Sequence, residues 1–146
     1  MSGRVVVNDH SSGWLRKGFA WVYPNEVVSG RPKPGQVCSI ADRHGRVLGV
    51  GIGDEGRLAL RVMRHGEGRL DARWMAGVLE RAQALRNRVV EPDTTGFRLV
   101  NGENDELAGV RVDWWDHYGV IALDSPSLSP IVDLVADWLE AHLQPR

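Results

Sequence analysis

The sequence predicts a mixed fold in two parts: a compact all-β barrel or sandwich over residues 1–70, then a small α+β domain over residues 71–146. Turns rich in glycine and proline separate short apolar runs in the first part, with the spacing of small β-barrels. From residue 71 onward, apolar residues recur at three- and four-residue steps, which indicates a helix. The composition, 42% hydrophobic and 25% charged, is that of a globular protein rather than a disordered or fibrous one.

Six strands are expected in the first part, at residues 5–7, 21–23, 26–28, 37–41, 47–52 and 58–63. Turn signals such as Pro24-Asn25 lie between them, and no helical period crosses these turns. Glycines alternate along the fifth strand from Gly49 to Gly53. They do not form a dinucleotide-binding turn, because Asp54 stands where a third glycine is required and no helix follows. They instead predict a tight bend at a barrel corner or a close approach between neighbouring backbones.

The second part is expected to contain a helix, three antiparallel strands and a second helix. Asp71 is a suitable N-cap for the first helix, and Pro92 ends it. The apolar stripe of this helix consists of Trp74, Val78, Ala82, Leu85 and Val89. Strands are expected at residues 97–100, 110–114 and 120–123, with a hairpin turn at residues 116–119. Ser129 caps the last helix, which begins at Pro130 and buries Trp138.

Two adjacent tryptophans, Trp114 and Trp115, lie at the end of a predicted strand. Consecutive side chains of a strand point to opposite faces of its sheet. We therefore expect one of the two rings in the core. The other is expected to be exposed or covered by a partner, which makes it a marker of an interface.

Charge is divided unevenly along the chain, whose net charge is −1. Residues 1–70 contain 11 Lys and Arg against 6 Asp and Glu, whereas residues 71–146 contain 7 against 13. A basic first part is consistent with nucleic-acid binding, and equally with a merely solvated surface. Arg57 and Arg61 are expected to share the outer face of the last predicted strand, roughly 13 Å apart at ~3.3 Å per residue. The candidate phosphate-binding residues are Arg16, Lys17, Arg31, Lys33, Arg43, Arg46, Arg57 and Arg61.

The sequence indicates neither a metal site nor a catalytic site. Cys38 is the only cysteine and lies among apolar residues of a predicted strand, so we expect a structural thiol. The five histidines show no ligand spacing, and the acidic residues 101–106 do not match a calcium loop. A small metal-dependent enzyme built on that loop is therefore the least favoured function. No apolar run approaches the ~20 residues that cross a bilayer, and a single cysteine fits a reducing cytoplasm, where we expect the protein.

A series of motifs follows one order along the chain. They are Leu15-Arg16-Lys17-Gly18, Trp21-Val22, Asn25-Glu26-Val27, Pro34-Gly35-Gln36-Val37, Asp42-Arg43-His44-Gly45-Arg46, Leu48-Gly49-Val50-Gly51, Leu60-Arg61-Val62, the helix ending at residues 81–86, and residues 97–113. This series resembles the PUA domain and central domain of the class I, S-adenosylmethionine-dependent methyltransferases that make 5-methylcytosine in large-subunit ribosomal RNA. Residues 97–113 are the most specific part of the resemblance. Ala20 and Ala108 stand where that family usually has proline, and Gln36 where it usually has Asp.

The resemblance implies a PUA-like pseudo-barrel over residues 1–70 that binds structured RNA, and a central α+β domain over residues 71–146 that helps to position the substrate. The family continues into a Rossmann-like domain that binds S-adenosylmethionine and carries the catalytic cysteine, and this chain shows no such segment. Alone, the chain is expected to bind no cofactor and to methylate nothing. A catalytic methyltransferase domain is expected as its partner, in cis or in trans. The wall facing that domain is expected to include Arg98, Asn101, Glu103, Asp105, Trp114 and Trp115.

A different class of function is also consistent with the sequence. The chain would then be a protein–protein docking module that uses its acidic second part and an exposed tryptophan, without binding RNA. The two functions differ in one observable, which is whether the isolated chain binds ribosomal RNA. The sequence indicates no particular oligomeric state.

Overall fold

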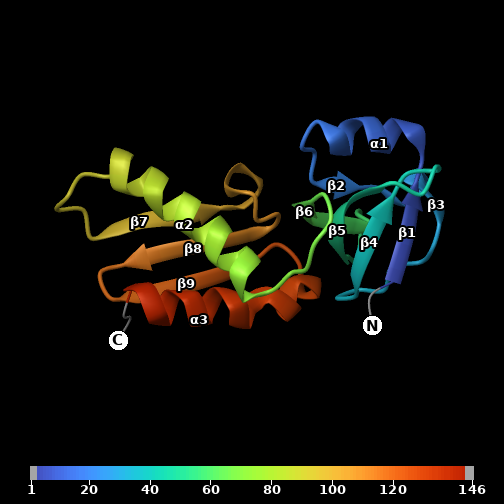
Figure 1. The fold of residues 1–146 in the computed structure, drawn as a ribbon. Coiled ribbons are helices and arrows are strands. Elements are labelled where there is room, and N and C mark those ends of the chain that lie inside the picture. Colours follow the sequence, from blue (N-terminus) through green and yellow to red (C-terminus); the bar gives the residue numbers. More distant parts are fainter. Residues whose placement is uncertain (1–2, 144–146) are drawn as a thin grey trace. The chain divides into compact units, whose positions relative to one another are not determined.

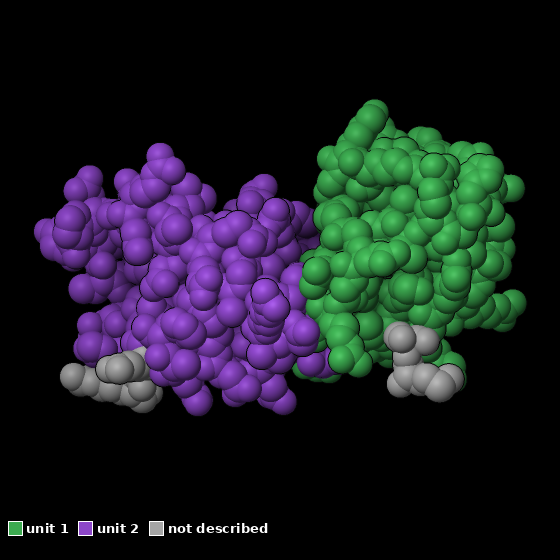
Figure 2. All heavy atoms as spheres, viewed as in Figure 1, with its two compact units in different colours: residues 1–70, 125–129 green, residues 71–124, 130–146 purple. Residues whose placement is uncertain are grey.

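A computed structural model describes residues 3–143 of the chain (Figure 1). The chain divides into two compact units (Figure 2). Unit 1 comprises residues 1–70 and 125–129, and unit 2 comprises residues 71–124 and 130–146. Within residues 3–143, no helix is both long enough and apolar enough to cross a membrane.

Unit 1 is built on a curled six-stranded sheet, and the six strands expected from the sequence are confirmed. They are β1 (Gly3–Val7), β2 (Trp21–Val22), β3 (Val27–Ser29), β4 (Val37–Ala41), β5 (Val47–Gly53) and β6 (Leu60–His65). Their order in the sheet is β2-β6-β5-β4-β1-β3. Neighbouring strands are antiparallel except β1 and β4, which run parallel. Branched apolar side chains from these strands fill one core.

A helix in unit 1 was not expected from the sequence. α1 (Asp9–Arg16) begins after Asn8, whose side chain accepts a hydrogen bond from the backbone N–H of Ser11 at 2.9 Å. Its residues have low helix propensity, and Leu15 is its one buried large apolar side chain. An apolar period is therefore absent from this segment. The N-cap and the packing of Leu15 against the sheet decide its structure instead.

The glycines of β5 allow other backbone segments to come close to this strand. A Cβ atom on Gly49 or Gly51 would lie 2.5 or 2.6 Å from a carbonyl oxygen of β6, and a Cβ atom on Gly53 only 2.1 Å from the Lys33 carbonyl oxygen. The expectation of close backbone approach is thus confirmed, and the ladder between β5 and β6 is irregular beside Gly51. Cys38 on β4 is fully buried, and this burial raises the pKa of its thiol.

Unit 2 has the expected order of helix, three antiparallel strands and helix, so the mixed fold class is confirmed. Its main elements are α2 (Ala72–Val89), β7 (Gly96–Asn101), β8 (Val110–Trp115), β9 (Tyr118–Leu123) and α3 (Val132–Leu143). Short 3₁₀ helices lie at Pro24–Glu26, Gly102–Asp105 and Pro126–Ile131. Asp71 is the N-cap of α2 and accepts a hydrogen bond from the Trp74 N–H, as expected.

Two details of the predicted helices are wrong. Leu85 and Val89 are exposed and Trp74 is only half-buried, because α2 buries a neighbouring stripe of residues instead. That stripe consists of Met75, Val78, Leu79 and Ala82. Pro130 does not begin α3 but lies within the preceding 3₁₀ helix. Trp138 of α3 is buried, as expected.

A buried carboxylate ties residues 125–129 into unit 1. Asp54 accepts hydrogen bonds from Arg61 Nε at 2.7 Å, from the Glu55 N–H at 2.8 Å and from the hydroxyl of Ser125. Leu128 in the same short segment is fully buried. Burial of the Asp54 carboxyl opposes ionisation, but the bonds from Ser125, Glu55 and Arg61 outweigh burial and lower its pKa.

The close approach at β5 predicts a destabilising substitution. Gly53→Ala is expected to lower the free energy of unfolding by roughly 1–3 kcal/mol, because the added carbon would overlap the Lys33 carbonyl. Urea unfolding followed by circular dichroism measures this change. Gly13→Ala in α1 is the matched control: no atom lies within 4 Å of the added carbon, and alanine favours the helix by roughly 0.5–1 kcal/mol. Equal stability of the two variants would contradict the close approach.

The Asp54 cluster predicts a pH-dependent stability. Asp54→Asn is expected to cost roughly 3 kcal/mol near pH 7, because it leaves the mostly buried Arg61 guanidinium without its carboxylate. The pKa of Asp54 in the folded protein lies below its ordinary value of 3.8, so its contribution is complete well above pH 3.8 and is lost as the pH falls below that value. The stability difference between wild type and variant should therefore shrink in acid. A constant difference from pH 7 to pH 3 would contradict this assignment.

Candidate nucleic-acid interface

The turn between β4 and β5 is organised by one carboxylate. The Asp42 side chain is 2% exposed and accepts hydrogen bonds from the N–H groups of His44 at 2.9 Å and Arg46 at 3.0 Å. It also accepts from Arg16 Nη2 at 2.6 Å and Arg46 Nε at 3.1 Å. Burial favours the neutral carboxyl, but these N–H groups and the two guanidinium charges outweigh it and lower the pKa of Asp42. The carboxylate therefore stays charged and holds the two arginines in place.

Four arginines gather at this turn, and we call them the turn cluster: Arg4, Arg16, Arg43 and Arg46. Arg4 donates from Nη2 to the Gly45 carbonyl at 3.1 Å, and Arg43 is exposed within the turn. The side chains of Arg16 and Arg46 are 48% and 71% exposed although both bind Asp42. Three of these four arginines were candidates from the sequence. Arg4 was missed because only the parallel pairing of β1 with β4 brings it here.

The remaining cationic candidates of unit 1 are dispersed. Lys17 follows α1 and places Nζ 5.0 Å from the centroid of the Trp14 ring. Arg57 is exposed but precedes β6, so the expectation that it shares a strand face with Arg61 is wrong. Arg61 is only 12% exposed and binds Asp54, which gives it a structural role. The two arginines therefore differ in exposure: Arg57 faces solvent, whereas the side chain of Arg61 is largely buried.

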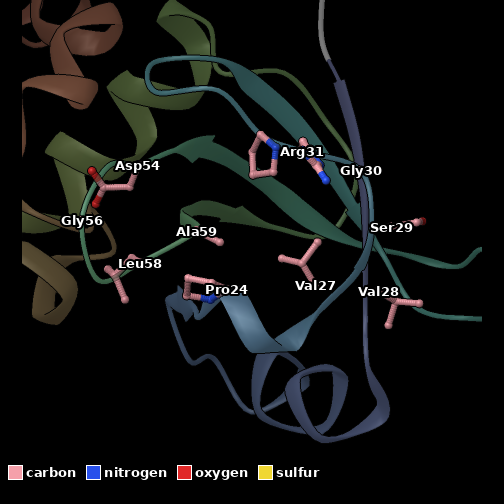
Figure 3. Close-up of a pocket in the computed structure, with 11 residues that line it drawn as sticks. Pro24, Val27, Val28, Ser29, Gly30, Arg31, Asp54, Gly56, Leu58 and Ala59 are labelled. Atoms are coloured by element: carbon pink, nitrogen blue, oxygen red, sulfur yellow. The ribbon is translucent and has the colours of Figure 1, made fainter.

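An open pocket of roughly 630 Å³ lies elsewhere in unit 1 (Figure 3). Two segments line it, one from Pro24 to Pro32 and the other from Asp54 to Ala59. Arg31 contributes a positive charge to its wall, and Lys33 is exposed on the same connection between β3 and β4. The Asp54 carboxylate, which also lines the pocket, already accepts three hydrogen bonds. Because Asp54 pairs with Arg61, Arg31 gives the pocket wall its remaining charge, which is positive.

The acidic loop of unit 2 is bound to α2 by arginines. Asp105 is 5% exposed, accepts two hydrogen bonds from Arg86 at 2.6 and 2.7 Å, and accepts a third from the Asn101 N–H at 2.7 Å. Glu106 accepts from Arg81 Nε at 3.0 Å. Asp105 thus fixes the loop, while Asn101 and Glu103 are exposed. In the described part of the chain, no three His, Cys, Asp or Glu side chains gather to hold a metal ion.

One face of the unit 2 sheet carries large exposed side chains. Trp115 is 56% exposed, Tyr118 60% and Val120 51%, whereas Trp114 is buried on the opposite face beside Leu139 of α3. The expected division of the two tryptophans is confirmed.

The strand register explains which residues share this face. Trp115 lies opposite Tyr118, and Asp113 lies between Arg98 and Val120 in the sheet. Arg98 donates to Asp113 at 2.8 and 3.2 Å, which lowers the pKa of Asp113. We call Arg98, Asp113, Trp115, Tyr118 and Val120 the open sheet face.

Comparison with known proteins agrees with this architecture. Residues 5–65 match the family of PUA-like domains. A ribosomal RNA large subunit methyltransferase of Deinococcus radiodurans is 36% identical over an alignment of 119 residues, a match that covers 75% of this chain and 29% of the relative. The ribosomal RNA large subunit methyltransferase I of Alteromonas mediterranea is 30% identical over 150 residues, covering 99% of this chain and 38% of the relative.

Solved structures show the same fold. A provisionally assigned SAM-dependent methyltransferase from Streptococcus mutans superposes with a TM-score of 0.82 at 14% identity, over 97% of this chain and 38% of that one. A second structure, of a provisionally assigned methyltransferase complexed with SAH, superposes with a TM-score of 0.83 over the same shares. The chain therefore spans 29% to 38% of the length of these relatives and structures. It has a PUA-like domain and is homologous, over most of its length, to part of the ribosomal RNA large-subunit methyltransferases.

Proposed function

We propose that this chain is the RNA-binding and substrate-positioning part of a ribosomal RNA methyltransferase, and that the turn cluster is its main contact with structured RNA. The observation that carries the proposal is the buried Asp42 carboxylate, which holds exposed arginines together on a PUA-like domain. Large-subunit ribosomal RNA is the proposed partner, since the relatives of the chain are named for it.

The geometry of the turn cluster suits phosphate. A guanidinium group has five N–H donors. Asp42 accepts a hydrogen bond from one side-chain donor of Arg16 and from one side-chain donor of Arg46. The remaining donors of these exposed side chains are available for phosphate oxygens, which guanidinium binds in a forked geometry. Because Asp42 already restrains both side chains, less conformational entropy is lost when RNA binds. Folded RNA is recognised largely through such backbone contacts and through shape.

The described residues do not fit S-adenosylmethionine, the cofactor of the family that the sequence resembles. The glycine-rich run that would have to cradle its charged and polar groups lies within β5, where backbone carbonyls occupy the space beside Gly49, Gly51 and Gly53. The turn from β6 into α2 also contains two glycines, Gly66 and Gly68, but Asp71 stands where the dinucleotide-binding fingerprint has its third glycine, and the Arg64 side chain fills the space beside Gly68. We therefore assign cofactor binding and catalysis to a methyltransferase domain, in cis or in trans, and no catalytic step to this chain.

Binding through the turn cluster predicts a specific salt dependence. Replacing Arg43 and Arg46 by Gln removes two phosphate contacts, so affinity for a fragment of large-subunit ribosomal RNA should fall and the slope of log Kd against log salt should decrease by about 2. Fluorescence anisotropy over a series of salt concentrations measures both quantities.

The control for this test is Arg73→Gln on α2, which removes an exposed arginine outside unit 1. This variant should bind RNA like the wild type. An unchanged salt slope in the double variant would remove the turn cluster from the interface. Absence of RNA binding by the wild-type chain at low salt would overturn the proposed function.

The open sheet face favours a second candidate function, which is docking of a separate methyltransferase domain. Large exposed aromatic side chains beside an ion pair are typical of protein interfaces. Arg98 and Trp115 of the wall expected from the sequence lie on this face, whereas Trp114 and Asp105 are buried and have structural roles. A docking module without RNA binding would use this face alone.

The docking function predicts that changes to the open sheet face weaken binding of a methyltransferase domain. Replacing both Trp115 and Tyr118 by Ala should weaken binding to the unmatched remainder of the Deinococcus radiodurans relative by about 10-fold or more, as at other aromatic hot spots. Calorimetry of the two purified proteins measures the affinity. Val89→Ala, which trims an exposed apolar side chain of α2, is the control. Equal affinities of wild type and double variant would exclude this face as the docking surface.

A further inference from the structure

A second surface of unit 1 is aromatic. Four rings follow one another along α1 and β2: His10, Trp14, Phe19 and Trp21. We call them the ring series. The ring centroids are 6.4 Å apart for His10 and Trp14, 5.9 Å for Trp14 and Phe19, and 5.8 Å for Phe19 and Trp21. Trp14 is 46% exposed and Phe19 40%, so the two central rings offer nearly half of their surface to solvent.

The backbone holds these two rings in fixed positions. After α1 ends at Arg16, the N–H groups of Lys17 and Phe19 donate to the Trp14 carbonyl at 3.0 and 3.1 Å. The Gly18 N–H donates to the Leu15 carbonyl at 3.0 Å, and Gly18 has a φ of +92°, which a residue with a side chain rarely adopts. The tight turn after α1 therefore places Phe19 beside Trp14. A tilted contact between Trp14 and Phe19 and an edge-on contact between Phe19 and Trp21 orient the rings further.

One cation lies directly on the ring series and indicates the kind of ligand that this surface would take. Lys17 holds its ammonium over the Trp14 ring, and the preceding residue, Arg16, belongs to the turn cluster. The only acidic residue of α1, Asp9, lies at the opposite end of this helix. An apolar protein surface seated on Trp14 would strip water from the Lys17 ammonium without replacing it. A nucleotide supplies both a base that stacks on the ring and a phosphate that pairs with the ammonium.

We infer that Trp14 and Phe19 form a stacking platform for unpaired RNA bases, with Lys17 binding the phosphate beside the stacked base. This inference rests on the proposed RNA-binding function and adds the kind of RNA bound. The turn cluster binds backbone whatever its pairing, whereas the ring series requires bases that are free of a duplex. A loop or bulge next to a helix would satisfy both surfaces.

The test compares two single-stranded RNA probes of one length, one with natural bases and one with abasic riboses that keep every phosphate. Replacing Trp14 and Phe19 by Leu keeps apolar packing but removes the aromatic faces. This double variant should bind the natural probe at least about 5-fold more weakly and the abasic probe as wild type does. Leu85→Ala, at an equally exposed apolar side chain of α2, is the control and should bind both probes normally.

Photo-crosslinking of the wild-type chain to a 4-thiouridine probe gives a second readout, which does not depend on the folding of a variant. Cross-links in the peptide containing residues 14–19 are expected. Equal binding of natural and abasic probes by the wild type, or cross-links confined to residues 42–46, would overturn the stacking platform while leaving phosphate binding intact. Absence of binding to either probe would instead overturn the proposed function on which the platform rests.

Discussion

A single buried carboxylate determines the character of the cationic surface of unit 1. Asp42 is almost inaccessible to water, and burying such a charge is unfavourable unless it is fully bonded. Two backbone N–H groups and two guanidinium groups supply the bonds, and the lowered pKa of the Asp42 carboxyl reflects them. The same bonds hold the end of α1 to the β4–β5 turn through Arg16. The hydrogen bonds that the buried Asp42 requires therefore also set the positions of Arg16 and Arg46 in the proposed RNA contact.

The same chemistry recurs at Asp54 and Asp105, with a different result. Each carboxylate is buried and binds one arginine, Arg61 or Arg86, whose side chain is only 12% or 13% exposed. In both cases the arginine has a structural role, because its largely buried guanidinium group pairs with the carboxylate. At Asp42, by contrast, the arginines remain about half exposed or more. Counting basic residues in the sequence therefore overestimates the cationic surface, because the exposure of each arginine, rather than that of its partner carboxylate, differs between these sites.

Local sequence signals account for most of the fold and for little of the site. Turn residues predicted all six strands of unit 1, and strand alternation predicted that one of Trp114 and Trp115 is buried. α1 was not predicted, because its residues are weak helix formers and show no apolar period. Its N-cap and the burial of Leu15 stabilise it instead. Arg57 and Arg61 were expected on one strand face because the strand was predicted to begin at residue 58; β6 begins at Leu60, so Arg57 lies outside it. Arg4 joins the turn cluster through a parallel strand pairing that no local pattern encodes.

The position of α1 connects the two proposed contacts. Arg16 reaches the turn cluster and Lys17 reaches the ring series, so consecutive residues at the end of one helix belong to the proposed phosphate-binding surface and the proposed base-binding surface. Phosphate contacts supply affinity that is independent of sequence, and stacking requires bases free of a duplex. A surface that combines both favours RNA in which a helix adjoins an unpaired segment over a fully paired duplex or a bare polyanion. Selectivity of this kind comes from RNA structure rather than RNA sequence, and it agrees with the substrate-positioning role that we propose for this chain.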